Sequence, residues 1–259
     1  MRKILLLFLI ILLSVILVLD ILNRIIQKQP GIIKPPLPVL STKKPEFPEL
    51  IGEKIVYDVK LGEINLGKAR FNHLANVQLD GRTVNLAIFE TRLIRFRDVE
   101  KIYSDPETFL PLKVERDIVV WPKAEKITED YDQKNFILTI TKTQGKKQEQ
   151  TLLKHDGSIH NAILLPYYVR RTAKLQPGWT LKANLPTQQF EIKLVAMEDL
   201  KTPAGKFKSY YFQSTPQRFE IWISADERRI PLKIKGCGGI GYTMVMREYS
   251  LAEAVLERK

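Results

Sequence analysis

The sequence is poor in residues that build metal and redox sites. Its 259 residues include one cysteine, Cys237, and three histidines, His73, His155 and His160. A lone cysteine cannot form an intramolecular disulfide, and it cannot supply a thiolate-rich metal site. A structural zinc site needs three or four converging ligands. The imidazoles of His155 and His160 do not lie on one helix face, so they do not converge on a common metal. We therefore expect neither a metal nor a cofactor.

Recognisable catalytic motifs are also missing. No Gly-x-Ser-x-Gly elbow presents a serine nucleophile. The glycine-rich stretch 236–241 resembles a phosphate-binding loop, but such a loop is followed by a helix whose N-terminus receives the anion. A strand pattern follows here instead. The stretch therefore predicts a hairpin turn, a bulge or a close approach of backbone.

Two acidic residues, Asp98 and Glu100, alternate on a predicted strand and can point the same way. Paired carboxylates can perform acid–base chemistry. Basic side chains surround them, which favours a cross-strand ion-pair cluster with Arg95, Arg97 and Lys101. We therefore predict that the chain has no enzymatic activity and no catalytic residue.

Acidic residues are fewer than basic ones. The sequence has 29 Asp and Glu against 41 Lys and Arg, which gives a formal net charge of +12. A basic balance favours anionic partners such as lipid headgroups or acidic polymers. The basic residues are scattered along the chain, however, and ordinary solvation of a basic surface also explains the excess.

A long apolar run occurs once, at the N-terminus. Arg2 and Lys3 precede an apolar stretch at residues 4–19 that only Ser14 breaks, and Asp20 follows it. About 19 helical residues span about 28 Å, close to the hydrocarbon thickness of a bilayer. No Ala-x-Ala cleavage site follows. The pattern favours an uncleaved transmembrane signal anchor at 1–23, with a cleaved signal peptide as the alternative.

The positive charges that precede the apolar stretch favour an orientation with the N-terminus in the cytoplasm. We expect a single-pass protein of the inner membrane with its bulk in the periplasm. Six prolines between residues 30 and 48 indicate an extended linker over 24–48.

The remaining chain predicts a β-rich domain at 49–251, followed by a short tail at 252–259. Apolar residues alternate with polar ones in many short segments, as in Ile55, Tyr57 and Val59. The dipeptide Asp80-Gly81 is typical of a hairpin turn. We predict a mainly β fold, a large curled antiparallel sheet or open barrel-like domain. One helix is expected at 158–172, capped by Ser158 and kinked or restarted by a proline.

Six motifs in order resemble a bacterial exported family of unknown function numbered 3108. The first reads Gly-Glu-Lys-Ile-Val-Tyr at 52–57 and continues with Leu-Gly-Lys-Ala at 66–69; the others occupy 105–113, 167–170, 175–178, 202–207 and 221–232. The resemblance covers residues 47–250. It implies a β-rich domain exported to the periplasm and no assigned reaction.

The sequence offers one hint of a binding surface, the tryptophans Trp121, Trp179 and Trp222. Each can fill the core or line a surface for an apolar ligand or a partner. Our first hypothesis is a non-enzymatic envelope protein that binds a lipid, an anionic polymer or a partner protein. The alternative is a hydrolase acting on a cell-wall or lipid substrate, which requires clustered carboxylates with perturbed pKa values. Export removes nucleic acid as a partner.

Overall fold

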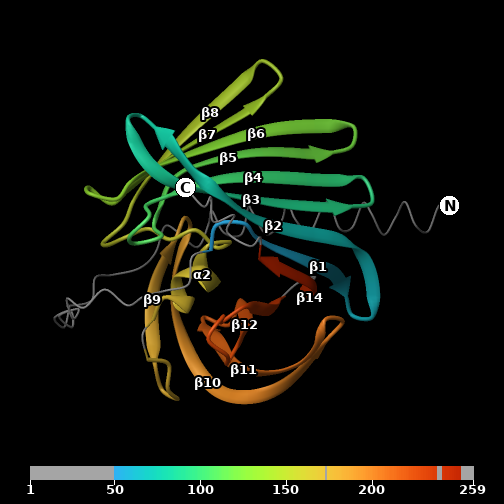
Figure 1. Cartoon of the computed structure of the whole chain (residues 1–259). Coiled ribbons are helices and arrows are strands. Elements are labelled where there is room, and N and C mark those ends of the chain that lie inside the picture. Colours follow the sequence, from blue (N-terminus) through green and yellow to red (C-terminus); the bar gives the residue numbers. More distant parts are fainter. Residues whose placement is uncertain (1–49, 173, 238–240, 252–259) are drawn as a thin grey trace, which may run out of the picture. The chain divides into compact units, whose positions relative to one another are not determined.

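The computed structural model describes residues 50–172, 174–237 and 241–251, which form one antiparallel sheet of 14 strands and one short helix (Figure 1). The elements are β1 (Glu53–Leu61), β2 (Ile64–Leu79), β3 (Arg82–Leu93), β4 (Phe96–Ser104), β5 (Pro111–Val120), β6 (Lys123–Asp132), β7 (Ile137–Gln144), β8 (Lys147–Lys154), α2 (Leu165–Arg170), β9 (Thr180–Leu185), β10 (Gln188–Thr202), β11 (Gly205–Thr215), β12 (Phe219–Ser224), β13 (Pro231–Gly236) and β14 (Thr243–Leu251). The predicted anchor, linker and tail lie outside these residues. Within the described part, no helix has the length and apolar character needed to cross a bilayer.

Two meanders make up the sheet. Strands β1 to β8 follow one another in order, as do β9 to β14, and β1 pairs with β14 between the two runs. The outermost strands are therefore β8 and β9, and the sheet does not close. The predicted mainly β fold with a large antiparallel sheet is confirmed, in its open form.

Alternation of apolar side chains explains why the strands form as they do. Ile55, Tyr57 and Val59 are buried on one face of β1, as predicted, because successive side chains of a strand point to opposite sides. We call this the inner face of the sheet. The predicted turn joins β2 to β3, where Asp80 and Gly81 both adopt positive φ, as a type I′ hairpin requires.

The helix is shorter than predicted and begins later. It spans Leu165–Arg170, its N-cap is Leu164, and Pro166 lies in its first turn, where a missing N–H costs nothing. Ser158 is therefore not the cap. Its neighbour Ile159 instead forms a parallel bridge to Asn184 of β9, so backbone bonding to the sheet takes the place of a helical turn.

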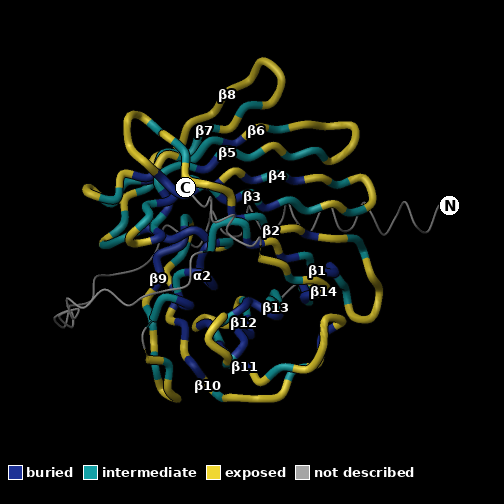
Figure 2. The backbone as a smooth tube through the Cα atoms, viewed as in Figure 1, coloured by how far each residue is buried: buried dark blue, intermediate teal, exposed yellow. Residues whose placement is uncertain are grey.

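Two apolar clusters meet at α2. The first joins the inner faces of the β1–β7 region to residues 159–167, and the second packs α2 against β9–β12. Tyr167 stacks on Phe71 of β2 with ring centroids 4.1 Å apart. Figure 2 shows the resulting concentration of buried residues around α2 and the exposure of β8 and of several hairpin ends. The helix and the segment before it thus cover this part of the inner face.

A buried ion pair fastens the helix to the sheet. The two terminal guanidinium nitrogens of Arg170, Nη1 and Nη2, donate to the Glu53 carboxylate at 2.8 and 2.9 Å, and Nη2 also donates to the Arg228 carbonyl at 2.6 Å. The side chains are 4% and 0% exposed. Because the pair links α2, β1 and the β12–β13 loop, it fixes where the helix lies on the inner face.

Glycine permits a close approach between β13 and β14, as predicted for the glycine-rich stretch. The Gly236 N–H donates to the Tyr242 carbonyl at 3.0 Å. A Cβ on Gly241 would lie 2.3 Å from the Gly236 carbonyl oxygen. No larger residue fits there unless the backbone moves.

Candidate functional site

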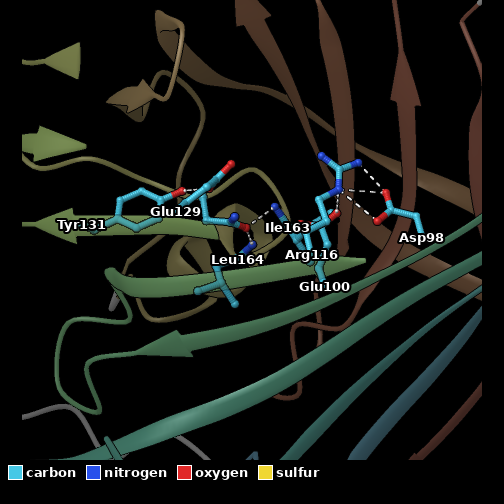
Figure 3. A network of polar contacts seen from close by, with 8 residues as sticks. Asp98, Glu100, Arg116, Glu129, Tyr131, Ile163 and Leu164 are labelled. Atoms are coloured by element: carbon cyan, nitrogen blue, oxygen red, sulfur yellow. Dashed lines mark hydrogen bonds and ion pairs between the residues drawn. The ribbon is translucent and has the colours of Figure 1, made fainter. Parts of the chain in front are cut away.

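Charged side chains gather on the inner face where β4, β5 and β6 lie side by side (Figure 3). Asp98 and Glu100 come from β4, Arg116 lies opposite Glu100 on β5, and Glu129 comes from β6. Alternation along β4 places both acids on the same face as buried Ile102. Two carboxylates therefore contact one guanidinium, and the third, Glu129, interacts with it electrostatically. We call these four residues the inner-face cluster.

Arg116 is the centre of the inner-face cluster. Its Nε donates to both carboxylate oxygens of Asp98 at 3.0 Å, and its Nη2 makes a further short contact to the same group. Its Nε also lies 3.6 Å from the Glu100 carboxylate. The Arg116 side chain remains 33% exposed, whereas the side chains of Asp98 and Glu100 are 8% and 11% exposed. Solvent therefore reaches the cluster on the Arg116 side.

A polar chain connects the cluster to the segment before the helix. The Tyr131 hydroxyl donates to Glu129, and Asn161 hydrogen-bonds to the same hydroxyl. The Asn161 side-chain oxygen accepts from the N–H groups of Ile163 and Leu164 at 2.8 and 3.2 Å. The segment that leads into α2 is thereby held against β6 by buried polar contacts.

Burial perturbs the acids of the cluster. It raises the pKa of Glu100 to about 7, and the nearby Asp98 and Glu129 carboxylates add to the rise while Arg116 opposes it. Burial also raises the pKa of Glu129, against the hydrogen bond from Tyr131. Arg116 supplies one positive charge, whereas the three acids carry three negative charges when all are ionised. Arg116 alone therefore does not neutralise them.

Tyr242 approaches the inner-face cluster from the start of β14. Its side chain is 51% exposed, yet the surrounding protein raises the pKa of its phenol, and Glu100, then Asp98, contribute to the rise while Arg116 opposes it. Tyr242 therefore lies within electrostatic reach of the cluster although it comes from the other meander.

The predicted cross-strand ion-pair cluster is confirmed, but its basic partner is Arg116. The three basic residues expected to form it do not. Arg97 pairs with Glu90 at 3.1 Å, Arg95 lies over Trp121, and Lys101 is exposed. Counting outward from the turn at 105–110 would place Glu115 opposite Glu100. The pairing shifts by one residue between Tyr103 and Ser104, and this shift brings Arg116 opposite Glu100, so the sequence carries no simple signal for it.

The three tryptophans lie in separate places. Trp121 is exposed at the β5–β6 turn. Trp179 packs edge-on against Phe212 at the margin of the second apolar cluster. Trp222 is buried, stacks on Tyr211 and donates its Nε1–H to Glu198. They do not form one common surface.

The histidines are dispersed and partly buried. Burial lowers the pKa of His73 and of His160 to about 4 each, so both imidazoles are neutral at pH 7. His73 contacts Phe109 edge-on and His160 contacts Tyr168 edge-on. In the described ranges, no three His, Cys, Asp or Glu residues are grouped as a metal would require.

Comparison with known proteins assigns the chain to a family. Residues 56–247 match the family described as protein of unknown function (DUF3108). The chain belongs to that family. No curated protein matches the chain. Among solved structures, the chain resembles the beta-barrel-like protein of domain of unknown function DUF1849 from Brucella abortus, with a TM-score of 0.50 and 8% identity over 78% of this chain and 98% of that one.

Two further structures resemble the chain more distantly. One is a candidate exported protein with a YmcC-like fold from Bacteroides fragilis, with 9% identity over 79% of this chain and 98% of that one and a TM-score of 0.28. The other is a candidate lipoprotein from Parabacteroides distasonis, with 9% identity over 79% of this chain, 97% of that one and the same TM-score of 0.28. At 8% identity, what this chain shares with the Brucella protein is its fold.

Proposed function

We propose that this DUF3108 protein is a non-enzymatic binding protein of the cell envelope, and that its inner-face cluster holds a polar envelope polymer. The observation that carries the proposal is the excess of carboxylates over guanidinium groups: Asp98 and Glu100 contact Arg116, Glu129 interacts with it electrostatically, and the Arg116 side chain is 33% exposed. An incoming ammonium or hydroxyl group supplies the compensation that Arg116 alone does not.

The chemistry of the cluster argues against two of the ligand classes considered from the sequence, a lipid and an anionic polymer, and favours a different kind of polymer. An acyl chain gains nothing from charged groups, and an anionic polymer is repelled by Asp98, Glu100 and Glu129. A polymer with hydroxyl and ammonium groups can donate to the carboxylates and accept from Arg116. Tyr242 adds an aromatic surface beside the cluster. An amino-sugar polymer combines these properties.

The N-terminal segment supports an envelope location. Its apolar run and the prolines behind it suit a single-pass anchor and a spacer, with the sheet on the periplasmic side of the inner membrane. A C-terminal alkaline phosphatase fusion should be active in cells, whereas a C-terminal β-galactosidase fusion should not. The reverse pattern would place the domain in the cytoplasm and exclude an envelope ligand.

Binding is tested by calorimetric titration of the full chain in detergent with two probes, a glucosamine tetramer and its N-acetylated counterpart. Both carry hydroxyl groups, but only the first carries ammonium groups. We expect the glucosamine tetramer to bind more tightly, and E129Q to weaken its binding at least tenfold, since a hydrogen bond to a charged group contributes about 1.5–3 kcal/mol.

The matched control is E115Q, which removes a carboxylate from the neighbouring strand on the opposite face of the sheet. Its affinity should equal that of the unmodified chain. If neither probe binds, or if E115Q weakens binding as much as E129Q, the inner-face cluster is not a polymer site.

One observation favours the alternative of a cell-wall hydrolase. Glu100 has a pKa near 7 and stands beside Asp98, which is bound by Arg116, and two acids whose environments differ in this way can divide the roles of acid and base. Mass spectrometry of both probes after prolonged incubation distinguishes the two functions. Shortened oligosaccharides that disappear with E100Q would establish hydrolysis, and unchanged probes would support binding alone.

A further inference from the structure

Exposed apolar residues lie at two hairpin ends, β3–β4 and β5–β6. Figure 1 shows these two turns close together on one side of the sheet. Ile94 at the β3–β4 turn is 73% exposed, and Val120 and Trp121 at the β5–β6 turn are 41% and 64% exposed. The two turns are bonded to each other, because the Trp121 N–H donates to the Arg95 carbonyl at 3.0 Å. We call Ile94, Val120 and Trp121 the hairpin-end patch.

Basic residues surround this patch. The Arg95 guanidinium lies 5.2 Å from the centroid of the Trp121 ring, and Lys123 follows the same turn and is exposed. Among the described residues, neither Arg95 nor Lys123 forms a salt bridge with a carboxylate. Arg92 and Arg97 share the single acid Glu90 at 2.7 and 3.1 Å. The ends of β3 to β6 thus carry positive charge beside exposed apolar surface.

This combination suits a lipid surface. Tryptophan favours the boundary between headgroups and acyl chains, exposed isoleucine and valine gain from burial there, and each Lys or Arg near an anionic leaflet adds to the attraction. The next hairpin on the same side, β1–β2, carries Ile64, which is 66% exposed. A membrane can therefore contact several turns at once.

We propose that the hairpin-end patch docks the domain on an anionic lipid bilayer. The chain can satisfy this geometry if it is anchored by its N-terminus. The chain enters the sheet at Glu53, at the end of β1 that lies opposite the β1–β2 turn. The nine residues of β1 separate Glu53 from that turn by about 30 Å. The 25 residues of the linker 24–48 can span at most about 80 Å when fully extended. The linker is long enough for the domain to turn this side toward the bilayer.

Docking is tested with the full chain reconstituted into vesicles of phosphatidylcholine alone or of phosphatidylcholine with phosphatidylglycerol, each with brominated acyl chains. Bromine quenches tryptophan fluorescence on contact. Trp222 is buried and Trp179 is partly covered, so quenching reports chiefly on Trp121. We expect quenching that is stronger with phosphatidylglycerol, that weakens in high salt, and that W121F abolishes.

Variants separate docking from mere proximity to the anchor. I94S should reduce the quenching of Trp121, whereas M197S, which alters an apolar side chain on β10 that is 52% exposed, should not. R95S and K123S should each lower the ratio of docked to undocked domain about fivefold in anionic vesicles only.

Quenching that is equal in the unmodified chain and W121F overturns the proposal, as does an equal effect of M197S and I94S. Loss of acrylamide access to Trp121 with rising protein concentration, without lipid quenching, would show instead that a second copy covers the patch.

Discussion

The Arg170–Glu53 ion pair gives the sharpest test of how the helix is held. R170M keeps an extended side chain but leaves the Glu53 carboxylate, which is 0% exposed, without its countercharge. Removing one partner of a buried pair costs about 3–5 kcal/mol, and the Arg228 carbonyl also loses its donor. For a domain of this size, a loss of that magnitude lowers Tm by about 6–20 °C.

The measurement is denaturant unfolding of the full chain at pH 7, followed by circular dichroism, with K147M as the control. Lys147 pairs with Glu149 on exposed β8, where both side chains are largely solvated, so K147M should leave the free energy of unfolding essentially unchanged. The double variant E53L/R170M should recover part of the loss, because no isolated charge remains buried. A loss below about 1 kcal/mol for R170M would refute the view that this pair fixes the helix on the sheet.

Three further predictions concern single sites. Burial, followed by the charge of Arg170, lowers the pKa of His73 to about 4, below the usual 6.5. The folded state therefore loses stability as pH falls from 6.5 to 4, because the unfolded chain binds the proton first. H73F should reduce the fall in the free energy of unfolding between pH 7 and pH 4 by about 3 kcal/mol, measured by urea titration at each pH. G67A should destabilise the β2–β3 pairing by about 1–3 kcal/mol, since its Cβ would lie 2.1 Å from the Arg92 carbonyl oxygen; an unchanged midpoint in thermal unfolding would contradict this. Burial, followed by Glu220, raises the pKa of the Cys237 thiol, so Cys237 should react with iodoacetamide more slowly than free cysteine at pH 7, and E220Q should speed the reaction.

Local patterns in the sequence were enough to predict the strands. Alternation of Ile55, Tyr57 and Val59 reports directly on which face of β1 is buried, and Asp80-Gly81 specifies its turn through backbone conformation alone. Both signals lie within a few residues, so they hold whatever the rest of the chain does.

Contacts between distant residues were harder to predict. The helix prediction failed at Ser158 because Ile159 bonds to Asn184, 25 positions later, and a pattern within one segment cannot show that competition. The acidic pair Asp98 and Glu100 was found by alternation, but Arg116 depends on the register between β4 and β5. Tyr242 reaches the cluster only through the curvature of the sheet.

The pairing of β1 with β14 has a consequence for how the chain folds. Each meander consists of neighbouring hairpins that can form early from contacts close in sequence, but the seam between them joins Glu53 to Leu251. Contacts this distant are slow to form because a long loop must close first. The two meanders can therefore be joined only once β14 has been synthesised and can reach β1. A chain that ends before β14 leaves β1 as an open edge in the middle of the protein, where another chain can add a strand.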